Sequence, residues 1–171
     1  ALALLVLAMP RLAGEMNVIG ARTVVAAALE NRPDKRQSLP AQTYAKAADA
    51  IDGFGGVTGD ARLLADRGLL LLRRSGMETT QAPQLLRQAM DATIEGLALN
   101  PGNTDAWARL AYLRARTGDR LGAGQALRMS LLAAPLSPQL MPSRLRLGLD
   151  LLDSLNEEQR SLLSRQVRLL W

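Results

Sequence analysis

The sequence contains no cysteine and no histidine. The missing thiols exclude a disulfide framework and a cysteine nucleophile, and the missing imidazoles exclude a Ser-His-Asp triad. A zinc site made of thiolate and imidazole ligands is excluded by the same two absences. Because no cluster of other catalytic side chains takes their place, we expect a protein that is not an enzyme and that uses no metal, no cofactor and no small-molecule substrate.

Aromatic residues are also scarce, at 3% of the 171 residues, whereas hydrophobic residues make up 48%. The core must therefore be built mainly from leucine and alanine, which lie near the top of the helix propensity scale. No stretch shows the sustained alternation of apolar and polar residues that indicates a half-buried strand. These features predict an all-α fold.

The net charge of +5 is made almost entirely by arginine, since Lys35 and Lys46 are the only lysines. The excess lies in residues 101–171, which carry ten cations and six anions. A basic balance is typical of proteins that bind nucleic acid or an anionic membrane surface. Because the aromatic residues that would stack on bases are few and scattered, we favour a solvated basic surface over a nucleic-acid site.

Residues 1–9 form an uninterrupted apolar run that stops at Pro10. As a helix these residues span ~14 Å, about half the thickness of a bilayer's hydrocarbon core. Three interpretations stay open: the end of a membrane anchor, the apolar part of an export signal, or a short helix buried in the fold or against a partner. We expect a membrane or partner contact here, followed by a second helical segment over Leu12–Glu30. The expected contact residues are Leu4, Leu5, Val6 and Leu7.

The remaining chain is divided by turn signals. Residues 31–40 are polar, contain two prolines and read as a linker, so residues 1–30 form a separate N-terminal segment. A helix is predicted from Pro40 to about Ile51, where Gly53 and the following glycines should break it. Its apolar face consists of Tyr44, Ala47, Ala48 and Ile51. Further helices are predicted at about 61–75, 83–99, 104–116, 121–134, 143–154 and 157–170. The expected N-terminal caps are Asp60 for the first of these, Thr104 or Asp105 for the third, and Asn156 with Gln159 for the last.

The segment 104–137 has a sequence pattern of its own. Its positions four, seven and eight are Trp107, Leu110 and Ala111, and its turn is Gly118-Asp119; Ala123, Leu127 and Pro135 follow. This pattern resembles a tetratricopeptide repeat. The resemblance implies an antiparallel helix pair over 104–134, with Trp107 and Leu127 buried between its helices or against the next. It also implies helical repeats over 41–137, closed by capping helices over 138–171.

Two positions depart from the family pattern. Arg114 stands where the repeat usually has an aromatic residue, and Ser130 where it usually has alanine. We expect Arg114 either to extend to the surface or to pair with an acid such as Asp150.

The first helices of such repeats line a concave surface, so the resemblance implies that Arg109, Arg116 and Arg120 bind an acidic partner segment. The layout is similar to that of bacterial envelope proteins with an anchor and a few repeats, some associated with polysaccharide export. We therefore expect a protein–protein scaffold or adaptor in an assembly at the bacterial inner membrane, with the periplasmic side favoured. The alternatives are an accessory subunit packed through its apolar N-terminus and, third, a basic helical domain that binds nucleic acid.

Overall fold

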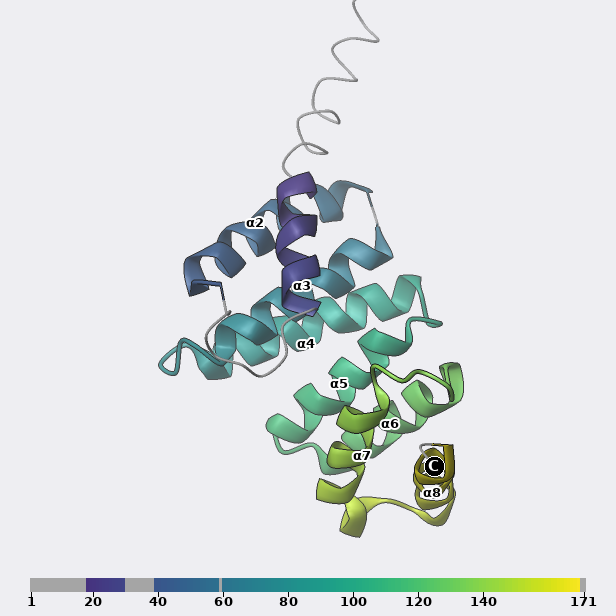
Figure 1. Ribbon diagram of the computed structural model, residues 1–171. Coiled ribbons are helices and arrows are strands. Elements are labelled where there is room, and N and C mark those ends of the chain that lie inside the picture. The colour runs from purple at the N-terminus through teal and green to yellow at the C-terminus, as the bar shows by residue number, and fades with distance from the viewer. Residues whose placement is uncertain (1–17, 30–38, 59, 170–171) are drawn as a thin grey trace, which may run out of the picture. The chain divides into compact units, whose positions relative to one another are not determined.

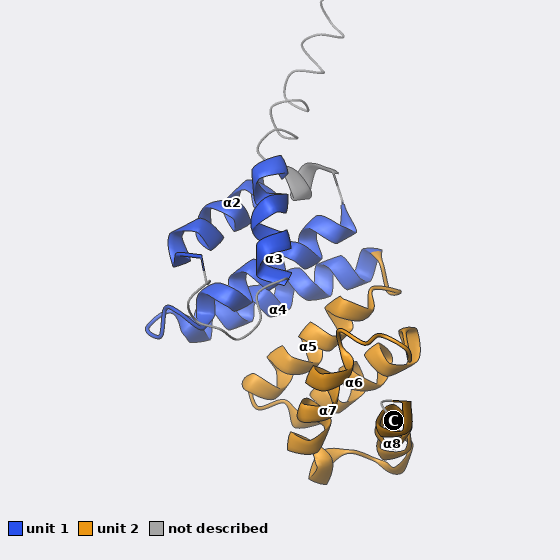
Figure 2. Cartoon of the chain, in the orientation of Figure 1, with its two compact units in different colours: residues 1–99 blue, residues 100–171 orange. Residues whose placement is uncertain are grey.

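The computed structural model describes residues 18–29, 39–58 and 60–169, with the backbone alone for residues 54–58. Within these ranges the chain is helical and contains no β-strand, which confirms the predicted all-α class. Two compact units divide the chain, residues 1–99 and residues 100–171 (Figure 2). The predicted contact residues of the apolar N-terminal run lie outside the described residues.

The first unit contains a helix over residues 18–29 and the helices α2 (Ala41–Thr58), α3 (Ala61–Ser75) and α4 (Ala82–Leu99) (Figure 1). Asp60 begins α3 as predicted, since its carboxylate accepts hydrogen bonds from the backbone N–H groups of Arg62 and Leu63. Such a cap satisfies two donors that the first helical turn would otherwise leave unpaired.

The predicted end of α2 near Ile51 is wrong. The helix continues through the glycines at 53, 55 and 56 and ends at Thr58. Each glycine costs about 1 kcal/mol relative to alanine in a helix, but tertiary packing routinely overrides such a preference. The predicted apolar face of α2 is confirmed: Tyr44, Ala47, Ala48 and Ile51 are all buried.

Helices α3 and α4 cross at very close range. Gly68 of α3 lies directly against Thr93 and the Ala89 carbonyl of α4, and Gly96 of α4 lies against the backbone of α3 at Ala65. An added Cβ at either glycine would overlap these atoms. The Thr93 hydroxyl donates to the Ala89 carbonyl at 2.7 Å, so this buried polar group is satisfied within its own helix.

The helix over residues 18–29 buries one face in the first unit. Val18, Ala21, Val25 and Ala28 are buried, at the spacing of a single helical stripe. Arg73 of α3 donates from Nη2 to the Ala28 carbonyl oxygen at 2.7 Å. This hydrogen bond joins α3 to the helix over residues 18–29.

The second unit begins with the hairpin of α5 (Thr104–Arg116) and α6 (Arg120–Ala133) (Figure 1). Thr104 or Asp105 is the cap expected from the sequence, but Asn103 performs this role, accepting from the Ala106 N–H at 3.0 Å. Gly118 turns the chain with φ of +90°, a conformation that side chains with a Cβ rarely adopt. Asp119 then caps α6 by accepting from the Gly122 N–H.

The interior of this hairpin is filled by small and aliphatic side chains. Leu110, Ala111, Ala123 and Leu127 are buried, as the repeat resemblance implies. Trp107 is only half-buried, which corrects the expectation that its ring is core; its indole N–H donates to the Pro101 carbonyl at 2.7 Å. The assignment of the hairpin to the tetratricopeptide family stays a prediction.

Three further elements complete the second unit: α7 (Met141–Asp150), the 3-10 helix η2 (Leu152–Ser154) and α8 (Glu157–Leu169). The helix predicted over 143–154 is thus divided, because α7 ends at Asp150. The predicted start of α8 is confirmed, since Asn156 and Gln159 form reciprocal side-chain-to-backbone hydrogen bonds of 2.9 Å. Among the described helices, none combines the length and the apolar character needed to cross a bilayer.

Candidate interaction surface of the C-terminal unit

A buried arginine holds α7 against the α5–α6 hairpin. Arg144 of α7 is 1% exposed and donates four hydrogen bonds. Its acceptors are the Ser130 hydroxyl at 3.0 Å, the Ser130 carbonyl at 2.7 Å, the Ala134 carbonyl at 2.8 Å and the Thr104 hydroxyl at 2.6 Å. One rigid guanidinium therefore joins the start of α5, the end of α6 and the body of α7.

The acceptors of Arg144 are themselves arranged by reciprocal hydrogen bonds. Thr104 Oγ1 donates to the Ser130 carbonyl at 3.1 Å, and Ser130 Oγ donates to the Thr104 carbonyl at 2.9 Å. All four acceptors are neutral oxygens, so burial lowers the pKa of the Arg144 guanidinium, an effect that the Asp105 carboxylate partly offsets. The structure thus explains Ser130 at a position where the repeat usually has alanine: the hydroxyl accepts from this cation.

Arg114, the second departure from the repeat pattern, lies partly exposed at the turn of the hairpin. Its Nη1 donates to the Gly122 carbonyl at 3.1 Å, and its Nε lies 3.8 Å from the Asp119 carboxylate. Arg114 thus pairs with an acid of its own hairpin, and Asp150 is not the partner. Its role in the structure is to brace the turn that Gly118 makes.

Of the three arginines predicted to bind a partner, one is buried and another forms hydrogen bonds with other elements of the same unit. Arg109 is buried, with 9% of its surface exposed. Arg120 is exposed, but its Nε donates to the Ser154 hydroxyl and its Nη2 to the Asp150 carbonyl, each at 2.8 Å. These bonds tie the start of α6 to the end of α7 and to η2, so Arg120 serves the packing of the unit.

Arg116 is exposed like Arg120, but its hydrogen bond lies within its own helix. It projects from the last turn of α5 beside Tyr112, which is itself 39% exposed. Arg116 Nη1 donates to the Tyr112 hydroxyl at 2.9 Å, and its guanidinium carbon lies 5.8 Å from the ring centroid. This geometry is typical of a cation–π contact and holds both side chains in a defined orientation.

Sequence reasoning missed two features of this surface. Tyr112 and Arg116 are four residues apart, and this helical spacing could have indicated that they meet. Arg144 carried no such signal, because its acceptors lie up to 40 residues away in the sequence. From the sequence alone, an arginine among leucines is expected to be a solvated surface charge, but in the structure Arg144 is buried.

No group of three or more acidic side chains among the described residues is placed to hold a metal ion. No protein-family model matches the chain, and no curated protein matches it either.

Proposed function

We propose that this chain is a non-enzymatic adaptor that binds other proteins within a membrane-associated bacterial assembly. Three features support the proposal: the helical hairpins, the apolar run at residues 1–9, and the layout shared with bacterial envelope proteins of the repeat type. The observation that carries it is the exposed Tyr112–Arg116 pair on α5.

Tyrosine and arginine are enriched among the few residues that supply most of the binding energy at protein interfaces. Arginine is costly to order on binding because it loses rotamer freedom, whereas tyrosine has only two side-chain torsions to fix. The mutual hydrogen bond and the cation–π contact restrict Tyr112 and Arg116 before any partner arrives. The pair therefore offers a flat aromatic face and the remaining guanidinium donors to an acidic or polar partner segment.

The adaptor itself stays rigid through Arg144, which fixes α7 on the hairpin that carries the pair. A rigid support of this kind is what a protein-binding surface on helices requires. The first helix of a tetratricopeptide repeat lines the binding face, and α5 occupies that position in the resemblance.

The test is capture of co-purifying proteins from native membranes with the Tyr112→Ala/Arg116→Gln variant. Its matched control is Arg87→Gln, because Arg87 is an exposed arginine of α4 in the other unit. The double variant should recover less partner protein than wild type at low salt, and the difference should shrink at moderate salt because ions screen surface charges. The control should match wild type. Equal recovery by all three proteins would reject this surface and favour an accessory subunit held by its apolar N-terminus.

A further inference from the structure

Helix α7 buries one face in the second unit and leaves the opposite face open. Arg144, Leu147 and Gly148 are buried on the inner face, and a Cβ added at Gly148 would overlap the Leu163 side chain of α8. The orientation of α7 about its own axis is therefore fixed. Three leucines lie on the open side of α7 and of the 3-10 helix that follows it, and we name them the leucine row: Leu145, Leu149 and Leu152.

The members of the leucine row share one face. Leu145 and Leu149 are four residues apart in α7, which places them one above the other on successive turns. Leu152 follows three residues later in η2, where side chains at this spacing eclipse. Leu149 is 66% exposed and Leu152 is 43% exposed, whereas Leu145 is half-buried.

A row of charged side chains runs beside the leucine row, each member one position later in the sequence. This charged row consists of Arg146, Asp150 and Asp153, and all three are exposed. Among the described residues none forms an ion pair or a side-chain hydrogen bond with them, although Arg146 and Asp150 are four residues apart in one helix. The row is thus basic at its start and acidic at its end.

We propose that α7 joins two copies of this chain through an antiparallel pairing of these rows. Two antiparallel helices related by a two-fold axis bring the same flank of each helix together. If Leu149 of both copies lies at the axis, Leu145 of one copy meets Leu152 of the other. The leucine row then covers itself, and the charged row of one copy lies along the charged row of the second.

The positions of the charges fit this pairing. At ~1.5 Å per helical residue, Arg146 lies ~4.5 Å from the axis on one side, and Asp150 and Asp153 lie ~1.5 Å and ~6 Å from it on the other. Because the two-fold axis reverses the direction of the second helix, Arg146 of each copy lies level between the two carboxylates of the other. Arginine pairs well with carboxylates at such a position.

The same charges argue against an anionic membrane as the occupant. Asp150 and Asp153 carry unpaired carboxylates beside the leucines, and a negative surface would repel them. Arg120 and Arg160 reach this end of the row, but they donate to the backbone carbonyls of Asp150 and Leu152 and leave both carboxylates unpaired.

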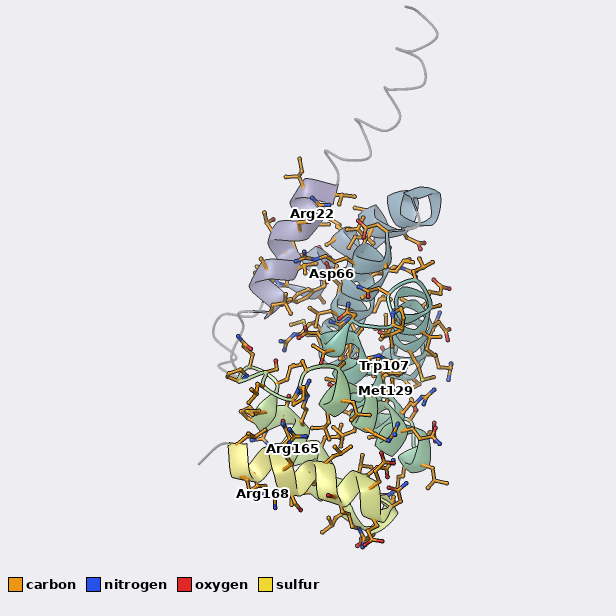
Figure 3. The ribbon with its side chains drawn as sticks, turned by 90° about the vertical axis from the view of Figure 1, so that its right-hand side faces the viewer. Arg22, Asp66, Trp107, Met129, Arg165 and Arg168 are labelled. Atoms are coloured by element: carbon orange, nitrogen blue, oxygen red, sulfur yellow. The ribbon has the colours of Figure 1, made fainter. Side chains whose placement is uncertain are left out.

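Within its described residues α8 offers no comparable row, and it therefore supplies control positions. Arg165 and Arg168 lie exposed on its last turns (Figure 3). Val167 and Leu169 are also exposed, but they are two residues apart and lie on opposite flanks of the helix.

The dimer should be weak, because α7 has only ten residues and spans ~15 Å. Interfaces that bury less than about 1,200 Å² are typical of transient complexes. The test is therefore sedimentation equilibrium of the full-length chain over a concentration series from about 10 μM to about 1 mM. Wild type should pass from monomer to dimer within this series.

Charge reversal identifies the surface that dimerises. Arg146→Asp makes the charged row wholly acidic, and Asp150→Arg/Asp153→Arg makes it wholly basic. Each variant alone should raise the dissociation constant by about tenfold or more, because like charges then face each other. An equimolar mixture of the two should dimerise again, and the control Arg165→Asp on α8 should behave like wild type. Circular dichroism checks that each variant keeps its helices.

A cross-link tests the two-fold axis itself. Because the chain has no cysteine, Leu149→Cys introduces a single thiol. Two thiols at the axis lie within the Cα separation of about 7 Å that a disulfide tolerates, so oxidation by copper phenanthroline should give a covalent dimer. Val167→Cys on α8 should stay largely monomeric under the same conditions.

Three results would each overturn the proposal: a wild type that stays monomeric throughout the series, a mixture that does not dimerise, or equal cross-linking of the two cysteine variants. Self-association that ignores every charge change would likewise reject α7 and assign the contact to another surface, such as the apolar run at residues 1–9. Self-association needs no other protein, so its failure leaves the proposed adaptor function standing, and loss of partner capture leaves the dimer standing.

Discussion

The close crossing of α3 and α4 predicts that Gly96→Ala destabilises the first unit. A Cβ added at Gly96 would lie 2.8 Å from the Ala65 backbone nitrogen, 2.9 Å from the Ala61 carbonyl oxygen and 3.1 Å from the Ala65 Cβ. Two of these atoms belong to the backbone of α3, which cannot rotate away as a flexible side chain can. The helices must therefore separate to admit one methyl group.

The magnitude follows from two opposing effects. Alanine is favoured over glycine by about 1 kcal/mol within a helix, which by itself would stabilise the variant. Overpacking a well-filled core costs about 1–3 kcal/mol, and separating two helices also weakens their other contacts. We expect a net loss of about 2 kcal/mol in the free energy of unfolding. The matched control is Gly53→Ala in α2, where an added Cβ meets nothing within 4 Å and should stabilise the helix.

The assay is urea unfolding of the full-length chain followed by circular dichroism, with hydrogen exchange of the α3 and α4 amides reporting on the first unit separately. Gly96→Ala should unfold at a lower urea concentration and exchange faster in both helices, and Gly53→Ala should unfold at the same or a higher concentration. If Gly96→Ala proved as stable as wild type, the close approach of the two helices would be refuted.

Three further variants test individual contacts. Arg144→Ala should lower the free energy of unfolding by about 3–5 kcal/mol, because it leaves a cavity and unpaired acceptors. Arg144→Met should lower it less, because methionine fills the space without a desolvated charge, and urea denaturation of the two variants measures the difference. Arg73→Met should speed hydrogen exchange near the end of the helix over residues 18–29, since the Ala28 carbonyl loses its donor; unchanged exchange would show that the bond contributes nothing. Asn103→Ala should cost about 1 kcal/mol by removing the cap of α5, and a loss below ~0.3 kcal/mol would mean that water replaces it.

Local sequence signals predicted the elements well where the deciding contacts are short-range. Asp60 begins α3, Gly118 turns the hairpin, and Asn156 with Gln159 begins α8. Each depends on a hydrogen bond or a backbone conformation spanning a few residues, so the sequence pattern contains the whole cause. The same reasoning failed in α2, which stays helical through its glycines as far as Thr58.

The candidate interaction surface was less predictable, because exposure is a property of the folded unit. Arg109 and Arg116 share a helical face in the sequence, yet one is buried and the other open. Arg120 reads as a surface charge, but it bonds to groups 30 and 34 residues away. Burial and pairing of this kind depend on which elements meet, and no local pattern encodes that.

The amino-acid sequence by itself determined the all-α class, because leucine and alanine dominate and no strand pattern competes. It also determined most helix limits, through caps, prolines and glycines that act on their own neighbours. Only the tertiary structure decided which arginines are buried and which are exposed to solvent and able to contact a partner. Arg144 is buried where the start of α5 and the end of α6 surround it with neutral oxygens, whereas Arg165 and Arg168 of α8 are exposed to solvent. These outcomes depend on contacts between residues far apart in the chain, and such contacts exist only after the helices have packed.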